Sequence, residues 1–196
     1  MKKLIIASNN AKKRQEITVI LGELGIEIVA ADATAFVHVE EDADSFSGNA
    51  RKKAEAFAHA NNLPALADDS GLCVDALNGA PGLYSARFAG ESASDADNNA
   101  KLLQLLDGKD HRRAHFTCAL HLAYPDNTQP LSSEGQVDGE ILKQAVGDSG
   151  FGYDPLFFCP ELGKAFASAS PEEKASVSHR GRALRSLAEQ LKNKPL

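Results

Sequence analysis

The chain has 196 residues, 43% of them hydrophobic and 24% charged, which is an ordinary composition for one globular domain spanning residues 1–196. Its formal net charge of −6 argues against binding to a nucleic acid polymer, so a phosphate-bearing ligand needs local positive charge or a metal ion to attract it. Its 3 cysteines form no CxxC pair and no apolar run is long enough for an export signal or a membrane span, so we expect a soluble protein of a reducing, cytoplasmic compartment, without disulfides, bound zinc or a membrane partner.

Apolar residues recur along the chain with the spacing of strands in some segments and of helices in others. In chain order these patterns predict a strand at 3–7, a helix at 10–24, a strand at 26–30, a helix at 45–61, two extended segments at 64–68 and 71–77 around a DDSG turn, a helix that follows 92–95 and ends near 106, strands at 115–124, 131–141 and 155–159, and a helix that starts at 170. Because strands and helices are interspersed, we expect an α/β fold with a mixed β-sheet flanked by helices.

The segment SNNAKKRQE, residues 8–16, joins the first predicted strand to the first helix. Asn9 or Asn10 is suited to cap that helix. Lys12 and Lys13 then crowd its first turn, where the helix dipole disfavours cations and a bound anion would reverse that effect. The segment therefore indicates either a phosphate site or a basic turn exposed to solvent.

Two pairs of adjacent carboxylates stand out, Glu40 with Glu41 in an acidic loop and Asp68 with Asp69 at the end of an apolar run. Neighbouring side chains of a strand point to opposite faces, so both aspartates reach one site only if the strand stops there, which the following Ser-Gly favours. Carboxylates, substrate phosphates and waters are the usual ligands of Mg²⁺. The aspartates indicate either a magnesium site or a turn with solvated side chains.

Two further segments carry weaker patterns. Asn49 and Lys53 share one face of a predicted helix, although a lysine beside a buried stripe commonly just extends to solvent. The glycine-rich segment 147–155 places Phe151 and Tyr153 in a turn, where their rings either stack on a base or pack against a neighbouring loop.

The C-terminal segment EEKASVSHRGRAL contains three residues that could bind a ligand, which are Lys174, His179 and Arg180. On one continuous helix Lys174 and His179 would lie about 140° apart and would not serve one ligand. Gly181 and the serines predict a break near 178–181 that would let His179 and Arg180 turn back. Arg180 offers a donor fork suited to a carbonyl oxygen or a phosphate. The alternative is that His179 and Arg180 are only a surface feature.

Together, in this order and spacing, these segments resemble the inosine/xanthosine triphosphate pyrophosphatase family, whose members remove damaged purine nucleotides. The likeness covers nearly the whole chain and rests on SNNAKKRQE, the EE…F..NA..KA block, LPALADDSGLCVDAL, GAPGLYSARFAG, FGYDPLFF and EEKASVSHRG. One region departs from the family, because EEDADSFSGNA replaces a pattern nearer to EETGxTFxENA, and Gly48 stands where a Glu is usual.

The resemblance implies Mg²⁺-dependent hydrolysis of ITP, dITP or XTP to the monophosphate and pyrophosphate. It also implies an elongated sheet in two lobes with the active site in the cleft, and a homodimer. Asp69 is then the general base and a metal ligand, with Glu40 or Glu41 and Asp68 as the other acidic groups around Mg²⁺. The implied triphosphate-binding positions are Ser8, Asn9, Asn10, Ala11, Lys12, Lys13 and Lys53. The implied nucleoside-binding positions are Ser70, Phe151, Gly152, Tyr153, Asp154, Lys174, His179 and Arg180.

Base choice is expected to follow from hydrogen-bond polarity. Inosine and xanthosine present a 6-oxo acceptor, which Arg180 or a nearby amide satisfies, whereas adenine presents a donor at that position. Two alternatives remain open: a related pyrophosphatase for pyrimidine or methylated nucleotides, and a nucleotide-binding module without turnover.

Overall fold

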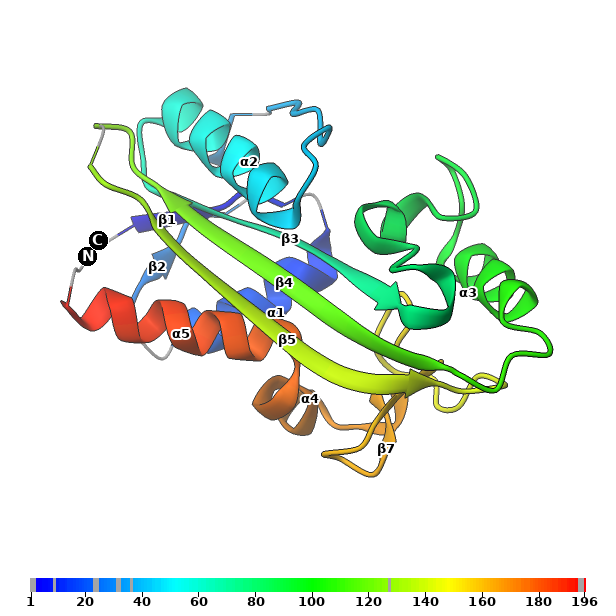
Figure 1. Ribbon diagram of the computed structural model, residues 1–196. Coiled ribbons are helices and arrows are strands. Elements are labelled where there is room, and N and C mark those ends of the chain that lie inside the picture. The colour runs from blue at the N-terminus through cyan, green and yellow to red at the C-terminus, as the bar shows by residue number, and fades with distance from the viewer. Residues whose placement is uncertain are drawn as a thin grey trace. The chain divides into compact units, whose positions relative to one another are not determined.

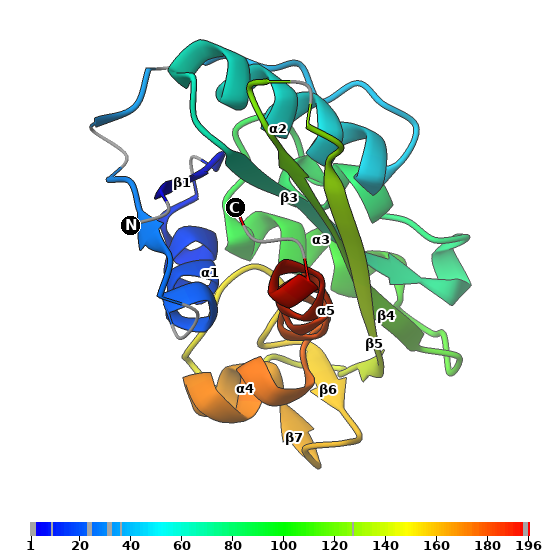
Figure 2. The ribbon, with the colours of Figure 1, turned by 90° about the vertical axis from the view of Figure 1, so that its left-hand side faces the viewer.

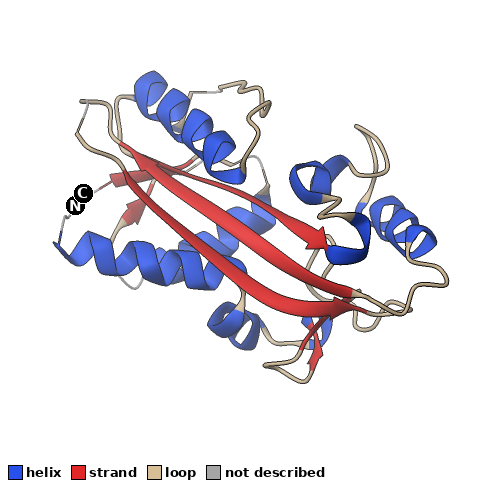
Figure 3. Cartoon of the chain, viewed as in Figure 1, coloured by secondary structure: helices blue, strands red, loops and turns tan. Residues whose placement is uncertain are grey.

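The computed structural model describes residues 3–8, 10–22, 25–30, 33–35, 37–126, 128–193 and 196. Its strands (β), α-helices (α) and 3₁₀-helices (η) follow in the order β1 (Lys3–Ile6), α1 (Ala11–Gly22), β2 (Glu27–Ile28), α2 (Phe46–Asn61), β3 (Ala65–Val74), η2 (Asp75–Leu77), η3 (Gly82–Arg87), α3 (Asp95–Leu105), β4 (Arg113–Ala123), β5 (Leu131–Ile141), β6 (Phe157–Cys159), β7 (Lys164–Ala165), η4 (Phe166–Ser168), α4 (Pro171–Val177) and α5 (His179–Asn193). Helices and strands are interspersed along the chain, as Figure 3 shows.

The described strands form one mixed sheet in the order β2-β1-β3-β4-β5-β6-β7. β1 pairs in parallel with β2 and with β3, whereas β6 pairs antiparallel with β5 and with β7. The expected α/β fold with a mixed sheet and flanking helices is therefore confirmed. Within the described part of the chain, none of the helices is both long and apolar enough to cross a membrane.

The chain groups into two compact units. Unit 1 consists of residues 1–69, 118–135 and 180–196, and unit 2 consists of residues 70–117 and 136–179. The division falls inside β3, β4 and β5, so each of these strands contributes residues to both units.

Unit 1 has an apolar cluster on each face of its strands. One cluster joins alternate residues of β1 and β3 to α1 and α5, and it includes Leu4, Ile6, Ile17, Leu21, Leu66, Ala183, Leu184, Leu187 and Leu191. The other joins the intervening residues to α2, and it includes Ile5, Ala7, Ala54, Ala58, Ala65 and Ala67. Thus α1 and α5 cover one face of these strands and α2 covers the other, which Figures 1 and 2 show from two sides. This alternation decides the direction in which each later side chain of β3 points.

The core of unit 2 is rich in aromatic rings. The ring centroids of Phe116 and Phe157 lie 4.7 Å apart, and those of Phe157 and Phe166 lie 4.9 Å apart. The ring of His179 stacks on Phe116 at 4.8 Å. These contacts join β4, β6, η4 and the first residue of α5 around one apolar cluster.

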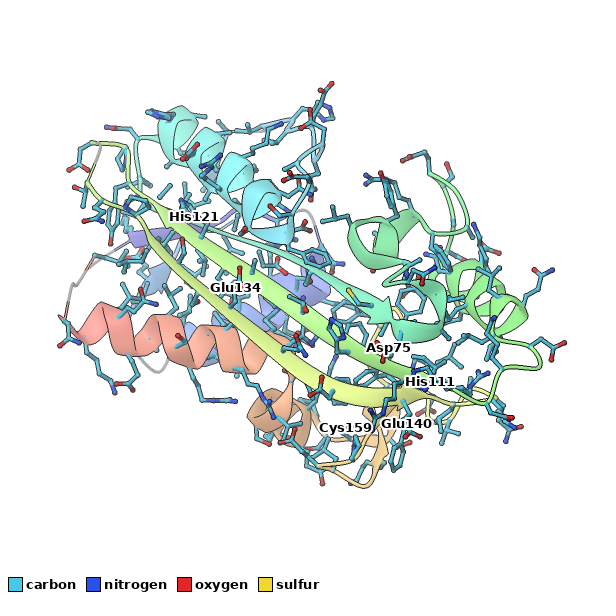
Figure 4. The ribbon with its side chains drawn as sticks, viewed as in Figure 1. Asp75, His111, His121, Glu134, Glu140 and Cys159 are labelled. Carbon is cyan, nitrogen blue, oxygen red and sulfur yellow. The ribbon has the colours of Figure 1, made fainter. Side chains whose placement is uncertain are left out.

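Several predicted boundaries are confirmed and several are wrong. β5 occupies 131–141 as expected, and its alternating pattern leaves residues such as Glu134 and Glu140 exposed, both of which are labelled in Figure 4. The expected helix break is also present, since Ser178 is extended between α4 and α5. The turn at DDSG is wrong, because β3 runs without interruption from Ala65 to Val74. The extended segment at 71–77 is wrong at its end, where η2 replaces strand, and the short β7 was not foreseen.

We predict that Leu66→Ala lowers the free energy of unfolding by about 2–5 kcal/mol, because it leaves a cavity in a fully buried cluster under α1 and α5. Urea unfolding followed by circular dichroism measures this change. Val19→Ala, at a side chain that is 64% exposed, is the control and should change stability by less than about 0.5 kcal/mol. Equal effects of the two substitutions would contradict the described core.

Candidate active site

The loop between β1 and α1 is organised by its own side chains. Asn10 caps α1, because its Oδ1 accepts hydrogen bonds from the backbone N–H groups of Lys12 and Lys13 at 3.0 and 3.1 Å. The Ser8 hydroxyl accepts from the Asn10 N–H at 3.2 Å, and Arg14 donates to the Ser8 carbonyl at 2.6 Å. Asn10 is therefore the cap that the sequence predicted as one of two possibilities. Asn9 lies outside the described residues.

Asp68 is the centre of a buried ion-pair network on the α1 and α5 face of β3. Its Oδ2 lies 3.1 Å from the Lys13 ammonium and 3.1 Å from the Arg180 guanidinium, and the residue is only 1% exposed. Arg180 also pairs with Glu16 of α1, so its fork bridges two carboxylates. Burial alone would raise the pKa of Asp68, but Lys13 and Arg180 outweigh it and hold that pKa well below its ordinary value.

Asp69 points to the opposite face of β3, toward α2. Its Oδ2 accepts a hydrogen bond from the Asn49 amide at 3.0 Å, and its Oδ1 lies 3.7 Å from the Lys53 ammonium. Burial raises the pKa of Asp69 above its ordinary value, although Lys53 and the Asn49 hydrogen bond oppose that shift. Adjacent aspartates thus have opposite environments because β3 does not stop at them.

The acidic loop before α2 contributes one carboxylate to the Asp69 side. Glu40 and Glu41 are both exposed, and Glu41 lies 2.7 Å from the same Lys53 ammonium. Asn49 also accepts from the Ala43 N–H at 2.9 Å, so one side chain joins this loop to Asp69. Of the two glutamates in the expected metal set, Glu41 is the one that the structure brings to the Lys53 side of Asp69.

The chemistry of this donor set fits a hard divalent cation. Carboxylate oxygens of Glu41 and Asp69 converge on one position, where the Lys53 ammonium is the cation present. The described residues contain no group of three or more His, Cys, Asp or Glu side chains that could hold a metal by themselves. One or two carboxylates, completed by substrate phosphates and water, are the usual Mg²⁺ environment, so this set suits a metal that arrives with a nucleotide.

A second set of expected residues lies in unit 2, around the loop that precedes β6. Asp154 Oδ2 accepts from the Phe151 N–H at 2.8 Å and from the Lys174 ammonium at 2.7 Å. That ammonium also lies 4.8 Å from the centroid of the Phe151 ring. Gly150 has φ +79°, and a Cβ there would come within 2.2 Å of Asp154 Oδ2. The loop is therefore closed tightly around the Asp154 carboxylate.

Tyr153 does not present its ring to a ligand. The residue is 4% exposed, belongs to the apolar cluster of unit 2, and donates its hydroxyl hydrogen to the Ser85 carbonyl at 2.9 Å. Of the two alternatives that the sequence left open for Tyr153, the structure favours packing inside the protein over stacking on a base, because the apolar cluster and the Ser85 carbonyl hold the side chain. Phe151 is partly exposed and stays a candidate for that role.

The remaining expected residues are divided between the two units. Ser70 is partly buried within β3, and His179 is 5% exposed in the aromatic core of unit 2. Arg180 belongs to unit 1, where it pairs with the carboxylates of Glu16 and Asp68, and its role in recognising a base stays a prediction. Glu16 was missed by sequence reasoning. Its position in the basic segment 8–16 was the available signal, but only the fold brings it to Arg180, 164 residues away.

Comparisons with known proteins identify the family. The sequence pattern of the Ham1 family matches residues 4–190. The chain belongs to the Ham1 family. Two curated relatives are named dITP/XTP pyrophosphatase: the protein of Desulforamulus reducens is 50% identical over 190 residues, 95% of this chain and 94% of the relative, and that of Salmonella paratyphi A is 44% identical over 196 residues, 98% of this chain and 100% of the relative.

Solved Ham1 structures have the same fold. The Ham1 protein of Staphylococcus aureus matches with a TM-score of 0.88 and 42% identity, and that of Coxiella burnetii with a TM-score of 0.89 and 39% identity. Each match covers 98% of this chain and 100% of the solved chain. The resemblance to inosine/xanthosine triphosphate pyrophosphatases is thus confirmed at the level of the family.

We predict that Asp68→Asn lowers the free energy of unfolding by about 3–5 kcal/mol, because the buried Arg180 and Lys13 lose their counter-charge. Asp69→Asn should change it by less than about 1 kcal/mol, since burial already disfavours that carboxylate's charged form. The low pKa of Asp68 makes its contribution complete above an unfolded-state pKa of about 3.9 and smaller as the pH falls further. Urea titrations at pH 7 and at pH values below about 4 measure the difference in unfolding free energy between the wild type and Asp68→Asn, which should become smaller at the lower pH. Equal losses of stability in Asp68→Asn and Asp69→Asn at pH 7 would contradict the described environments.

Proposed function

We propose that this Ham1-family chain is a nucleoside-triphosphate pyrophosphatase that hydrolyses dITP, XTP and ITP to the monophosphate and pyrophosphate, and so removes deaminated purine nucleotides from the pool. The observation that supports it most strongly is the convergence of the Glu41 and Asp69 carboxylates on the Lys53 ammonium. Two carboxylates that could bind a metal ion therefore lie beside an ammonium group that could bind a phosphate. The names of the relatives supply the substrate class.

In this proposal Mg²⁺ is held by Asp69 and Glu41, with Glu40 beside them. When bound, the ion supplies Lewis-acid polarisation of the phosphoryl group and lowers the pKa of water. Asp69 accepts the proton of the attacking water, a task that suits a carboxylate whose pKa is raised by burial. Asn49 fixes the rotamer of Asp69 through its hydrogen bond to Oδ2.

The Asp68 carboxylate has a different part in the proposal. Its Oδ2 already meets two cations, so we assign it the task of holding Lys13 rather than that of a metal ligand. Lys13 and Lys53 then offset negative charge on the triphosphate and on the departing pyrophosphate. The other proposed triphosphate-binding positions are those just before Lys13 in the sequence: Ser8, Asn9, Asn10, Ala11 and Lys12.

Base recognition is assigned to unit 2. The partly exposed ring of Phe151 offers a stacking surface, and Lys174 with Asp154 offers a charged donor and an acceptor next to it. A 6-oxo purine presents an acceptor to a donor such as the Lys174 ammonium, whereas adenine presents an amino group and leaves that donor unmatched. Ser70, Gly152 and His179 stay in the proposed nucleoside set, and Arg180 is the alternative donor for the 6-oxo group.

The single domain expected for residues 1–196 is part of this proposal, and it is supported by the family pattern, which matches residues 4–190 and so includes residues of both units. The resemblance also leads us to propose a cytoplasmic homodimer, which light scattering after size-exclusion chromatography tests.

We predict that Asp69→Asn lowers kcat for dITP by about 10²–10⁴-fold, because the attacking water loses its proton acceptor. Release of pyrophosphate, detected with a coupled inorganic pyrophosphatase, measures the change, and circular dichroism confirms that the variant is folded. Asp126→Asn, at an exposed carboxylate of the turn after β4, is the matched control and should retain wild-type turnover. An active Asp69→Asn enzyme would rule out the assigned general base.

We further predict that turnover is lost in EDTA and restored by Mg²⁺. Pyrophosphate release from dITP, assayed with and without the metal, measures this dependence.

We also predict that kcat/KM for dITP exceeds that for dATP by about 100-fold or more. A panel of purine, pyrimidine and methylated nucleoside triphosphates measures this selectivity. Faster hydrolysis of pyrimidine or methylated nucleotides favours the related-pyrophosphatase alternative. Tight nucleotide binding without pyrophosphate release favours a binding module.

A further inference from the structure

Both backbone groups of Gly152, its N–H and its carbonyl, are hydrogen-bonded to the first turns of α3. Its N–H donates to Asp95 Oδ2 at 2.7 Å, and its carbonyl accepts from the Asn99 side-chain amide at 3.0 Å. Asp95 and Asn99 are one helical turn apart and therefore share a face of α3. Both hydrogen bonds connect segments more than 50 residues apart, so they are tertiary contacts of unit 2 rather than local turn geometry.

We call these two hydrogen bonds to Gly152 the α3 clamp. Gly152 lies at the centre of the loop that carries the proposed base-recognition groups. Phe151 precedes it and Asp154 follows it, and Asp154 in turn binds the Phe151 N–H and the Lys174 ammonium. Gly152 has φ +61°, and a Cβ at this position would meet no atom within 4 Å. A glycine is therefore present for its backbone angle and not for lack of space. The two peptides that flank Gly152 join Phe151 to Tyr153 and Asp154, so fixing both peptides restricts the directions that Phe151 and Asp154 can take.

The capping of α3 does not require Asp95. Ser94 and Asp97 already form a complete capping box, in which the Ser94 hydroxyl accepts from the Asp97 N–H and Asp97 accepts from the Ser94 N–H. The Asp95 carboxylate is exposed at the same helix end, yet it is directed to the Gly152 N–H. Its hydrogen bond therefore serves the loop.

The orientation of the Asn99 side-chain amide is a second observation in favour of a role for the α3 clamp. Because its Nδ2 must face the Gly152 carbonyl, its Oδ1 is turned into the protein, where it is buried and finds no hydrogen-bond partner among the described residues. A buried acceptor without a partner costs free energy and calls for an explanation. Ordering of the Gly152 backbone provides one.

We propose that Asp95 and Asn99 are positioning residues that hold the loop 150–154 in the form that binds the base of the nucleotide. The inference rests on the proposed function. Neither residue touches the reacting phosphates; both act through Gly152 on Phe151, Asp154 and Lys174. Their loss is expected to weaken binding of the base in the ground state and in the transition state alike, which raises KM and leaves kcat nearly unchanged.

The test compares steady-state kinetics of Asp95→Ala and Asn99→Ala with those of the wild type. Each variant should raise KM for dITP by about ten-fold with kcat within about two-fold, and should lower the dITP-to-dATP ratio of kcat/KM by about ten-fold. Asp95→Asn keeps an acceptor oxygen for the Gly152 N–H, so it should recover most of the wild-type KM. Asp97→Asn is the matched control: it removes a charge from the same helix turn and weakens the cap, so it should lower the thermal midpoint without changing KM.

Four outcomes separate the possibilities. A raised KM in both alanine variants, with rescue by Asp95→Asn and no change in Asp97→Asn, supports the clamp. Unchanged KM and base discrimination in folded Asp95→Ala and Asn99→Ala overturn it. Equal KM changes in Asp97→Asn also overturn it, because helix stability would then be the cause. If wild-type protein fails to release pyrophosphate from dITP or XTP, the proposed function is wrong, and binding of IMP by calorimetry to the same variants still decides whether the clamp orders a base site.

Discussion

The arrangement of unit 1 depends on one constraint, which is that β3 continues without a break through two adjacent aspartates. Neighbouring side chains of a strand point to opposite faces, so Asp68 turns toward α1 and α5 while Asp69 turns toward α2. Each carboxylate then needs its own partners. The cations of Lys13 and Arg180 meet the first, and Asn49 with Lys53 meets the second. A turn at this point would have mixed the two environments.

The two environments divide the chemistry between neighbouring residues. Two cations keep Asp68 ionised and hold its pKa low, which makes it a fixed negative charge that orients Lys13. Burial raises the pKa of Asp69, which is the direction that favours a proton acceptor near neutral pH. Pairs of carboxylates whose surroundings move their pKa values apart are characteristic of sites with separate acid, base and electrostatic roles. The proposed pyrophosphatase mechanism uses this division directly.

The candidate residues of unit 2 lie in an ordered loop, whereas those of unit 1 form a buried network of charges. Asp154 closes the loop from within through Phe151 and Lys174, and α3 clamps it from outside at Gly152. Glycines with positive φ make such a loop possible but do not select one conformation, because glycine is free to adopt others. Side chains from distant segments make that selection. A distant contact of this kind also holds Tyr153 in the core, where its hydroxyl meets the Ser85 carbonyl, while Phe151, two residues earlier, is partly exposed.

The sequence by itself determined the α/β class, most helix and strand positions, a cap at Asn9 or Asn10 and a break near the start of α5, because these follow from periodicity, local hydrogen bonds and backbone preferences. Its motifs also determined the family. The tertiary structure alone decided that Glu41 is the glutamate beside Lys53, that Arg180 joins Glu16 to Asp68, and that α3 reaches Gly152. Those contacts join residues far apart along the chain, and no local pattern records which distant side chain a strand or helix face will meet once packed.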